Sequence, residues 1–311
     1  LNPGGAEGAF GYDIPNLLID HAMRNPHVPP WFWRGVNNNQ NAIYLECFID
    51  ELANAAGQDP LAFRRKMMAK YPKHLGVLNA VAERVGWDKP APQGISRGIC
   101  QHMGYGSYVA AAAEVSVTGN KVKIHRIVAA TNPGHAVNPA QIERQIAGSF
   151  VYGLSALFYG GITIKDGAVV ERNFDTFGSL RMAEMPKVES IIMPSNDFWG
   201  GVGEPTICVV APAVLNAIFA ATGKTPQTAV LMHINDTFGQ ANKTAIDRIF
   251  PTMNLPFKIV ESIAYDPAAR DLSVEVAKAK ATNADILMTV TRLNDAIILV
   301  REMVKQRWEP M

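Results

Sequence analysis

The sequence predicts an α+β region followed by an α/β region, and two observations carry this prediction. Up to residue 223, short helical patterns alternate with hairpin turns, as in an α+β fold. From residue 224, continuous apolar strands alternate with helical stretches, which favours three layers, a parallel sheet with helices on both faces. A chain of 311 residues has room for about two domains. We therefore expect domains over residues 1–223 and 224–311.

Three short helices are expected first. Apolar residues recur at helical spacing from Asn41 to a stop at Gly57, opposite a set of acidic residues, which predicts an amphipathic helix. Asp59-Pro60 supplies a cap and a first-turn proline for a second helix through Met68, and a third helix ends at Gly86. In the first helix the apolar set is Tyr44, Phe48, Leu52 and Ala55, and the acidic set is Glu46, Asp50 and Glu51.

Hairpins, a long helix and a closing helix complete the first region. The turn Thr118-Gly119-Asn120 between β-branched residues predicts a hairpin over 108–130, and Lys165-Asp166-Gly167 predicts a second hairpin. Asn138-Pro139 caps a helix that runs to about Phe158. The remaining elements are a strand from Val188 to Met193 and a helix from Ala211 to Ala221, stopped by Gly223.

In the second region, three continuous apolar runs predict the strands of the parallel sheet. They are Ala229 to Ile234, Phe257 to Ile263 and Ala284 to Val290.

Composition excludes several classes of function. The 29 Lys and Arg residues nearly balance the 28 Asp and Glu residues, and the net charge of +1 provides no field for nucleic acid. The longest apolar stretch, Ile207 to Leu215, is too short to span a bilayer. Three scattered cysteines and seven histidines show no metal-ligand spacing, so no metal ligands are expected. No signal peptide opens the chain at Leu1, and both ends are expected to be cut.

A glycine-rich turn carries the most suggestive carboxylate, Glu204. It follows Gly201 and Gly203, where the absence of a side chain lets the backbone approach a bound group closely. A Glu held beside the apolar stretch that follows is suited to act as a general base. The competing interpretation, which the local pattern alone favours, is a solvated Glu in an ordinary Gly-Pro turn. The P-loop Lys-Ser/Thr pair is absent, so this is not a phosphate loop.

Two further side chains are candidates for holding a bound group. Arg34, followed by Gly35, carries a guanidinium that can grip an anion through two hydrogen bonds. Gln145 lies in the predicted helix after Asn138 and can donate a hydrogen bond into a pocket. Taken in isolation, a surface Arg and a solvent-facing Gln are the commoner outcomes.

Segments in unbroken order from residue 1 to about 223 resemble the large subunit of the molybdenum hydroxylases, the xanthine oxidase and aldehyde oxidase family. The residues at 181–186 and 216–223 are most similar to the isoquinoline 1-oxidoreductase and nicotinate dehydrogenase-like beta subunits. The segments that carry the family resemblance are Trp33-Arg34-Gly35, the helix from Asn41 to Gly57 with Asp59-Pro60 after it, Asn138-Pro139 with Gln145, and Gly201 to Pro205 followed by Ala211-Pro212-Ala213.

This resemblance implies a molybdopterin cofactor and assigns roles by position. In the family, the glutamate matching Glu204 removes a proton from a molybdenum-bound hydroxyl, which then attacks an electron-poor carbon of an N-heteroaromatic or an aldehyde. Arg34, Gly35 and Gln145 match residues that contact the cofactor, and Gly201 and Gly203 belong to the same motif as Glu204. Xanthine oxidase-like members carry a substrate-stacking aromatic where this chain has Val36, which argues against a purine substrate.

The resemblance also implies partners. The family's glycine-rich pterin loop and the cysteines of its iron-sulfur relay are absent from this chain, which is expected to be the C-terminal part of the large subunit. An iron-sulfur small subunit and a cytochrome or other electron acceptor are therefore implied, together with a small-molecule substrate. A periplasmic location follows from the resemblance alone.

Residues from about 226 to 311 are similar to the second lobe of a periplasmic solute-binding protein of the branched-chain amino-acid transporter type. The resemblance rests on four segments: the run from Ala229 to Gln240, Tyr265-Asp266-Pro267, Asp271-Leu272-Ser273 and the run from Ala284 to Leu287. It implies that Phe238 and a residue near Arg292 face a ligand cleft. A packed loop aromatic and a solvated helix-start Arg are equally compatible with the pattern.

Three functions follow from these two resemblances. The first is a fragment of a molybdopterin-dependent hydroxylase, and the second is a solute-binding component of an ABC transporter. The third is a chimeric chain, joined near Thr222 to Pro226, that has no activity alone, because each site lacks an essential wall.

Overall fold

The computed structural model describes residues 10–19, 31–119, 121–223, 228–252 and 258–308. The chain divides into two compact units, Leu1–Gly223 and Lys224–Met311. Parts of three predictions lie outside the described residues: Asn120 of the first hairpin turn, Phe257 at the start of a predicted strand, and 224–226 of the predicted junction.

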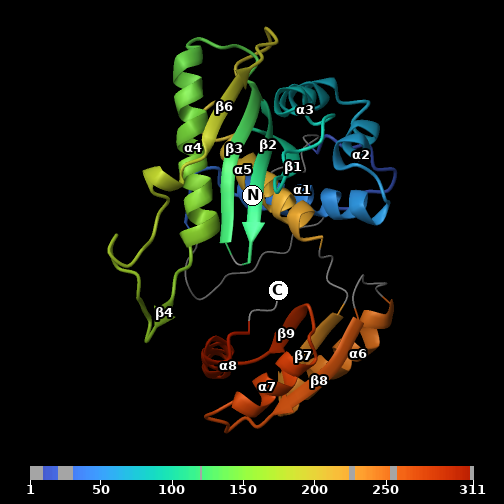
Figure 1. Ribbon diagram of the computed structural model, residues 1–311, viewed down its shortest axis with the longest axis vertical. Helices are drawn as coiled ribbons and strands as arrows, with labels where there is room; N and C mark the ends of the chain where they lie inside the picture. The colour runs from blue at the N-terminus through green and yellow to red at the C-terminus, as the bar shows by residue number, and fades with distance from the viewer. Residues whose placement is uncertain (1–9, 20–30, 120, 224–227, 253–257, 309–311) are drawn as a thin grey trace. The chain divides into compact units, whose positions relative to one another are not determined.

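The first unit is built on a four-stranded sheet in the order β1-β2-β3-β6 (Figure 1). Strands β1 (Ser96–Gly104), β2 (Ser107–Thr118) and β3 (Lys121–Asn132) are antiparallel, and β6 (Lys187–Ile192) runs parallel to β3. The predicted hairpin of β2 and β3 and the predicted strand β6 are confirmed. Strand β1 was not predicted, because its buried centre includes polar residues such as Gln101 and His102.

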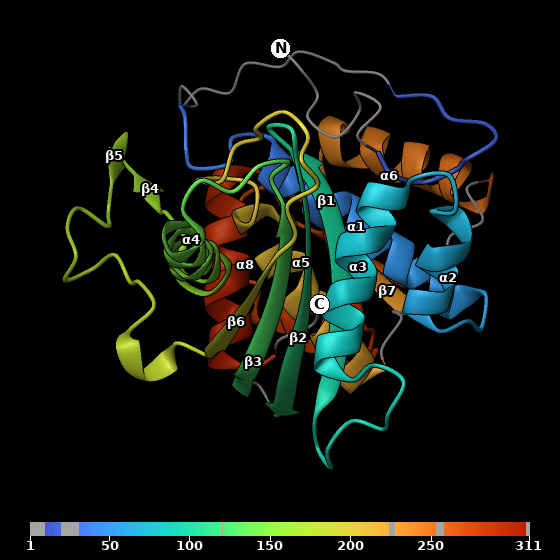
Figure 2. The same ribbon diagram turned by 90° about the horizontal axis from the view of Figure 1, so that it is seen from above.

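Helices cover both faces of this sheet. Figure 2 shows α4 (Pro139–Tyr159) and α3 (Pro72–Val85) on opposite sides of it. One core joins α4 and α5 (Ile207–Thr222) to one face of β2, and the other core joins α2 (Pro60–Met67) and α3 to the opposite face. Every residue from Val109 to Ala113 is buried, because the two faces of β2 serve different cores.

Capping chemistry agrees with the predicted helix starts. The side chain of Asp59 accepts a hydrogen bond from Ala62 N at 2.8 Å, and Asn138 accepts one from Gln141 N at 3.2 Å. Helix α5 begins at Ile207, four residues before the predicted start. A proline favours the first turn of a helix, but Pro212 lies inside α5. The helix extends to Ile207 because Ile207 to Val210 are buried in the core.

The predicted face of the first helix, α1 (Asn38–Ala55), is wrong. Tyr44 and Phe48 are 70% and 57% exposed, whereas Glu46 and Asp50 are buried. The reason is Arg64 of α2, which is fully buried against both carboxylates and turns the acidic face of α1 inward.

Distances within this buried cluster are short. The Nε of Arg64 lies 3.0 Å from Glu46 Oε2, and its Nη1 lies 2.7 Å from Asp50 Oδ1. Tyr12 donates its hydroxyl to Glu46 Oε1 at 2.6 Å, and Gln101 N donates to Glu46 Oε2 at 3.1 Å. Burial opposes the charge on Arg64, but Glu46, Tyr12 and Asp50 together outweigh that cost and raise the pKa of Arg64. The cluster is therefore a structural link between α1, α2 and β1.

Two small elements connect α4 to β6. Strands β4 (Ile164–Lys165) and β5 (Ala168–Val169) form the second predicted hairpin, and the turn at Asp166 and Gly167 has positive φ at both residues. A short 3-10 helix, η1 (Met182–Glu184), precedes β6.

The second unit is a three-stranded sheet that is parallel, as predicted, and its strand order is β8-β7-β9. Its elements are β7 (Thr228–Ile234), α6 (Thr237–Ile249), η2 (Phe250–Thr252), β8 (Lys258–Tyr265), α7 (Ser273–Ala281), β9 (Ile286–Val290) and α8 (Leu293–Lys305). Ala229 to Ile234 are all buried, so both faces of the central strand are covered. Alternate residues of β7, beginning at Val230, share a core with α7 and α8.

Candidate functional site

Four of the predicted site residues converge from three separate segments of the first unit. Arg34 precedes α1, Gln145 lies in α4, and Gly203 with Glu204 lies in the loop before α5. The Nε of Arg34 donates to the carbonyl of Gly203 at 2.8 Å, and its Nη2 donates to Gln145 Oε1 at 2.9 Å. One guanidinium therefore joins segments that are 111 and 169 residues away in sequence.

Glu204 is held by a backbone donor from the same turn as Arg34. Gly35 N donates to Glu204 Oε1 at 2.9 Å, and the carboxylate is half-buried. Gly35 has φ +88°, and a Cβ there would lie 2.6–2.7 Å from the Asn39 amide and from Ile207. A glycine is therefore required for the turn to approach Glu204 this closely.

Asn39, which the sequence did not single out, braces the Arg34 turn. Its Nδ2 donates to Arg34 O at 2.7 Å and to Val36 O at 3.2 Å. Val36 is a β-branched residue at φ +47°, a conformation that needs support from its surroundings. Among the described residues, Asn39 Oδ1 is buried without a hydrogen-bond partner. The brace therefore leaves one buried acceptor unsatisfied beside the Arg34 turn.

Gly201 packs against the turn between β1 and β2. Gly201 N donates to Tyr105 O at 2.8 Å, and Ser107 donates its hydroxyl to Gly201 O at 2.6 Å. A Cβ on Gly201 would lie 3.0 Å from Tyr105 Cβ, whereas a Cβ on Gly203 would meet only Gln145 Oε1 at 3.8 Å. The space that the glycines leave open thus lies at Gly203, beside Gln145.

Tyr105 is a second neighbour of Glu204 that the sequence did not reveal. It has φ +54° in the turn after β1. Burial raises the pKa of Tyr105, a hydrogen bond with Asn38 lowers it, and the charge of Glu204 raises it. The nearby thiol of Cys208 has its pKa raised to about 12 by burial and by Glu204, so it is protonated at neutral pH. Glu204 is therefore the ionisable acceptor at this position.

Exposed aromatic side chains flank the cluster. Trp33 and Tyr152 lie with ring centroids 5.9 Å apart, and the guanidinium of Arg34 lies 5.6 Å from the centre of the Tyr152 ring. Trp33 and Tyr152 are 42% and 52% exposed, so flat apolar surface is accessible beside the polar groups.

The donors present fit an anionic, oxygen-rich cofactor. Because Arg34 donates to Gln145 Oε1, the amide of Gln145 is oriented with its Nε2 as a remaining donor. The guanidinium, this amide and the open backbone at Gly203 supply positive charge and hydrogen-bond donors at one point. Across the described ranges, no three His, Cys, Asp or Glu side chains gather where they could hold a metal ion directly.

The two predicted ligand-binding residues of the second unit also lie together. The guanidinium of Arg292, after β9, lies 5.8 Å from the centre of the Phe238 ring, after β7. Its Nη2 lies 2.5 Å from Asp236 Oδ2. Both loops follow the carboxyl ends of strands β7 and β9, which are neighbours in the sheet.

In the part of the chain that the structure describes, no helix combines the length and the apolar character that crossing a membrane requires.

Comparison with known proteins supports the first resemblance. Residues 62–186 match the molybdopterin cofactor-binding domain. The chain is 25% identical over 222 residues to the beta chain of isoquinoline 1-oxidoreductase from Brevundimonas diminuta, and the match covers 70% of this chain and 28% of that protein. It is 27% identical over 233 residues to one of the subunits of nicotinate dehydrogenase from Pseudomonas putida, and this match covers 68% of this chain and 20% of that one.

A third relative is the membrane-bound aldehyde dehydrogenase [pyrroloquinoline-quinone] of Gluconacetobacter polyoxogenes. It is 29% identical over 244 residues, covering 70% of this chain and 31% of that protein. The chain thus spans between a fifth and a third of the length of these three relatives.

Among solved structures, the aldehyde oxidoreductase of Desulfovibrio desulfuricans matches with a TM-score of 0.50 at 12% identity. The match covers 61% of this chain and 39% of that one, and it shows a shared fold. Residues 62–186 therefore match a molybdopterin cofactor-binding domain, and the chain is similar to one oxidoreductase subunit and one dehydrogenase subunit. Gln145 lies inside the matched range 62–186, whereas Arg34 and Glu204 lie outside it.

Proposed function

We propose that the first unit is part of a molybdopterin-dependent oxidoreductase that hydroxylates a carbon of an N-heteroaromatic compound or an aldehyde, with water as the oxygen source. The observation that carries this proposal is the convergence of Arg34, Gly203 and Glu204 on Gln145, a residue within the range that matches a molybdopterin cofactor-binding domain. The relatives' names include enzymes of both substrate classes.

The bound cofactor supplies the redox centre that takes two electrons from the substrate carbon. Glu204 accepts the proton of the attacking hydroxyl group, and Gly35 N–H keeps its carboxylate aimed at the site. Arg34 and Gln145, which are joined to each other by a hydrogen bond, would hold the cofactor through the remaining donors of the guanidinium and the amide. The half-buried position of Glu204 limits water around the carboxylate during proton transfer.

The aromatic surface beside this cluster suits a flat substrate. Trp33 and Tyr152 present exposed ring faces within reach of Arg34, and stacking favours planar N-heteroaromatic or aryl aldehyde molecules. Val36 is 40% exposed on the same turn and provides no ring for a purine.

The proposed activity needs partner subunits that accept electrons. The two electrons leave through an iron-sulfur small subunit to a cytochrome or another acceptor, and the assembly works in the periplasm. The chain spans less than a third of the length of the isoquinoline and nicotinate enzymes' chains that it matches, so we propose that it acts only within a larger assembly and is inactive alone.

Loss of molybdenum on substitution of Arg34 tests the proposal. In the enzyme assembled with its other subunits, Arg34→Ala is expected to lower the molybdenum content at least about tenfold, because two hydrogen bonds that shape the site disappear. Metal content is measured by mass spectrometry on the purified assembly. Arg144→Ala, on the exposed face of the same helix as Gln145, is the matched control and is expected to keep full content. Equal metal in both variants would exclude a cofactor role for Arg34.

A second candidate function belongs to the second unit and rests on the contact between Phe238 and Arg292. In open α/β sheets, ligands usually bind at the carboxyl ends of two adjacent parallel strands, at the point where the strand order reverses. In this sheet the order reverses between β7 and β9. We propose that this position binds the carboxylate of an amino acid, as in a solute-binding protein of an ABC transporter.

A thermal shift experiment on the full chain tests this second candidate. Leucine or phenylalanine at millimolar concentration is expected to raise the melting temperature of the second unit, because a ligand that binds only the folded state stabilises it. Arg292→Ala should remove the shift, and Arg301→Ala, an exposed position on α8, should not. An undiminished shift in Arg292→Ala, or none in the unchanged chain, would exclude this binding mode.

A further inference from the structure

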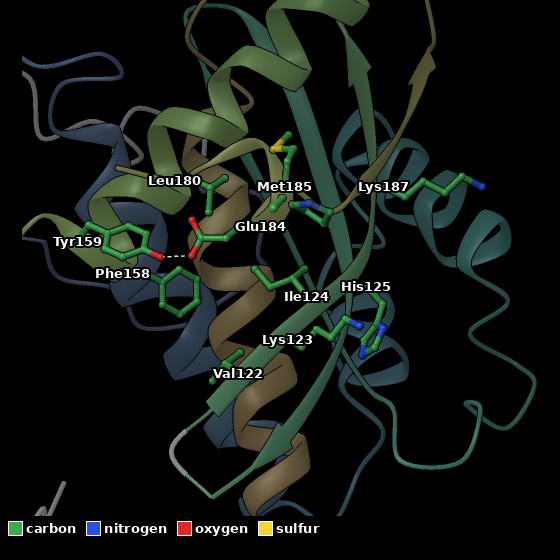
Figure 3. Close-up of a pocket in the computed structure, with 12 residues that line it drawn as sticks. Val122, Lys123, Ile124, His125, Phe158, Tyr159, Leu180, Glu184, Met185 and Lys187 are labelled. Atoms are coloured by element: carbon green, nitrogen blue, oxygen red, sulfur yellow. Dashed lines mark hydrogen bonds between the residues drawn. The ribbon is translucent and has the colours of Figure 1, made fainter. Parts of the chain in front are cut away.

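A pocket of about 710 Å³ lies between the start of β3, the end of α4 and the segment that leads into β6 (Figure 3). Gln145 and Tyr159 are 14 residues apart on α4, which places the pocket about 20 Å along the helix from the Arg34 cluster. It is therefore separate from the site described above. Its lining includes Val122, Ile124, Phe158, Tyr159, Leu180 and Glu184.

One part of the wall of this pocket is apolar and rests on the core. Val122, Ile124, Leu180 and Met185 are partly buried and pack against the same core as α4 and α5. Phe158 adds an aromatic side chain that is 40% exposed. The wall is thus preformed, and it leaves apolar surface open to a ligand.

One carboxylate, Glu184, is fixed at this wall. Tyr159 donates its hydroxyl to Glu184 Oε1, and Arg181 N donates to Glu184 Oε2 at 2.7 Å. Figure 3 shows the Glu184 carboxylate between Tyr159 and Ile124. The hydrogen bond from Tyr159 and the one from Arg181 N lower the pKa of Glu184, so this carboxylate is ionised at neutral pH.

The cationic lining residues are directed elsewhere. Lys123 and His125 alternate along β3 with Val122 and Ile124, so their side chains leave the opposite face of the strand. His125 Nε2 lies 2.8 Å from Ser116 Oγ, and Lys187 Nζ lies 2.8 Å from Glu189 Oε1. Lys187 extends away from the other labelled side chains in Figure 3. Arg181 is exposed next to Glu184 but does not line the pocket.

We propose that this pocket binds a small organic cation, an ammonium carried on an apolar body. The body lies on the wall formed by Val122, Ile124 and Leu180, and the cationic head lies between the Glu184 carboxylate and the ring of Phe158 or Tyr159. A carboxylate beside aromatic rings attracts an organic cation by charge and by the negative faces of the rings. This binding is independent of the proposed oxidoreductase activity.

Calorimetric titration of the full chain with benzyltrimethylammonium tests the proposal. The cation is expected to bind at least about tenfold more tightly than phenylacetate, which has a similar body and the opposite charge. Glu184→Gln should weaken cation binding about tenfold, and Glu143→Gln, on the exposed face of α4, should leave it unchanged. Phenylacetate binding as tightly as the cation would overturn the proposal, as would undiminished cation binding in Glu184→Gln.

A second variant separates binding from folding, since Glu184 also holds the η1 turn through Arg181 N. Phe158→Leu keeps an apolar side chain of similar size and removes the ring. This variant is expected to bind the cation at least about threefold more weakly, while its melting temperature stays close to that of the unchanged chain. If Phe158→Leu and Tyr159→Leu each bind the cation with unchanged affinity, neither ring contributes to binding. That result would overturn the proposal.

Discussion

Replacing Glu204 by Gln is expected to lower turnover by about 10²- to 10⁴-fold in the assembled enzyme, while molybdenum content stays unchanged. That range is the typical contribution of a positioned general base. The amide keeps the shape of the side chain and can still accept the hydrogen bond from Gly35 N, but it cannot take a proton. Turnover with an aryl aldehyde or an N-heteroaromatic compound, normalised to molybdenum, measures the effect.

Two companion variants make this result specific. Glu143→Gln is exposed on α4 and is expected to keep normal turnover. Glu204→Asp retains a carboxylate at a shorter reach and is expected to recover part of the lost rate. Turnover in Glu204→Gln within a factor of about three of the unchanged enzyme would remove Glu204 from the reaction.

Replacing Arg64 by Met is expected to destabilise the first unit by about 3–5 kcal/mol. This is the usual cost of removing one partner from a buried ion pair, because the remaining charges stay buried without compensation. Arg64 is fully buried, and Glu46 and Asp50 would both lose their cation. Urea unfolding followed by tryptophan fluorescence measures the change. All tryptophans except Trp308 lie in the first unit, so the signal reports mainly on that unit.

A neighbouring arginine provides the control for this substitution. Arg65 donates to Asn79 Oδ1 on the surface, and Arg65→Met is expected to change stability by no more than about 0.5 kcal/mol. Combining Arg64→Met with Glu46→Gln and Asp50→Asn should recover part of the loss, since no uncompensated charge then remains. Equal stability of the Arg64→Met and Arg65→Met variants would mean that water compensates the buried carboxylates.

Local signals predicted most helices, hairpins and parallel strands, because these depend on residues close in sequence. Asp59-Pro60 and Asn138-Pro139 identify helix starts, and Gly86 and Gly223 adopt the left-handed conformation that ends a helix. The parallel sheet of the second unit follows from its apolar runs. Periodicity alone assigned the wrong face of α1 to the core, since burial of Glu46 depends on Arg64, which lies 18 residues further on.

The candidate site depends even more on contacts between residues that are far apart in sequence. Nothing near Arg34 in the sequence indicates a contact with Gly203 or Glu204, and only the resemblance to a known family brought these residues together before the structure did. Asn39 and Tyr105 were missed because their roles arise from backbone turns with positive φ. The pocket at Glu184 was not predicted, since residues 181–186 contributed only to the family resemblance and the wall is assembled from three segments that are far apart in sequence.

The link between Gly35 and Glu204 also bears on when the site can form during biosynthesis. Its two ends are separated by 169 residues, so a ribosome must add all of them before the hydrogen bond can close. Helices α2 and α3 contact neighbouring segments and can form while synthesis continues, whereas α1 needs α5 as its partner. The site therefore stays open until Glu204 has been synthesised, and a group that needs both ends of this link can bind only after that point.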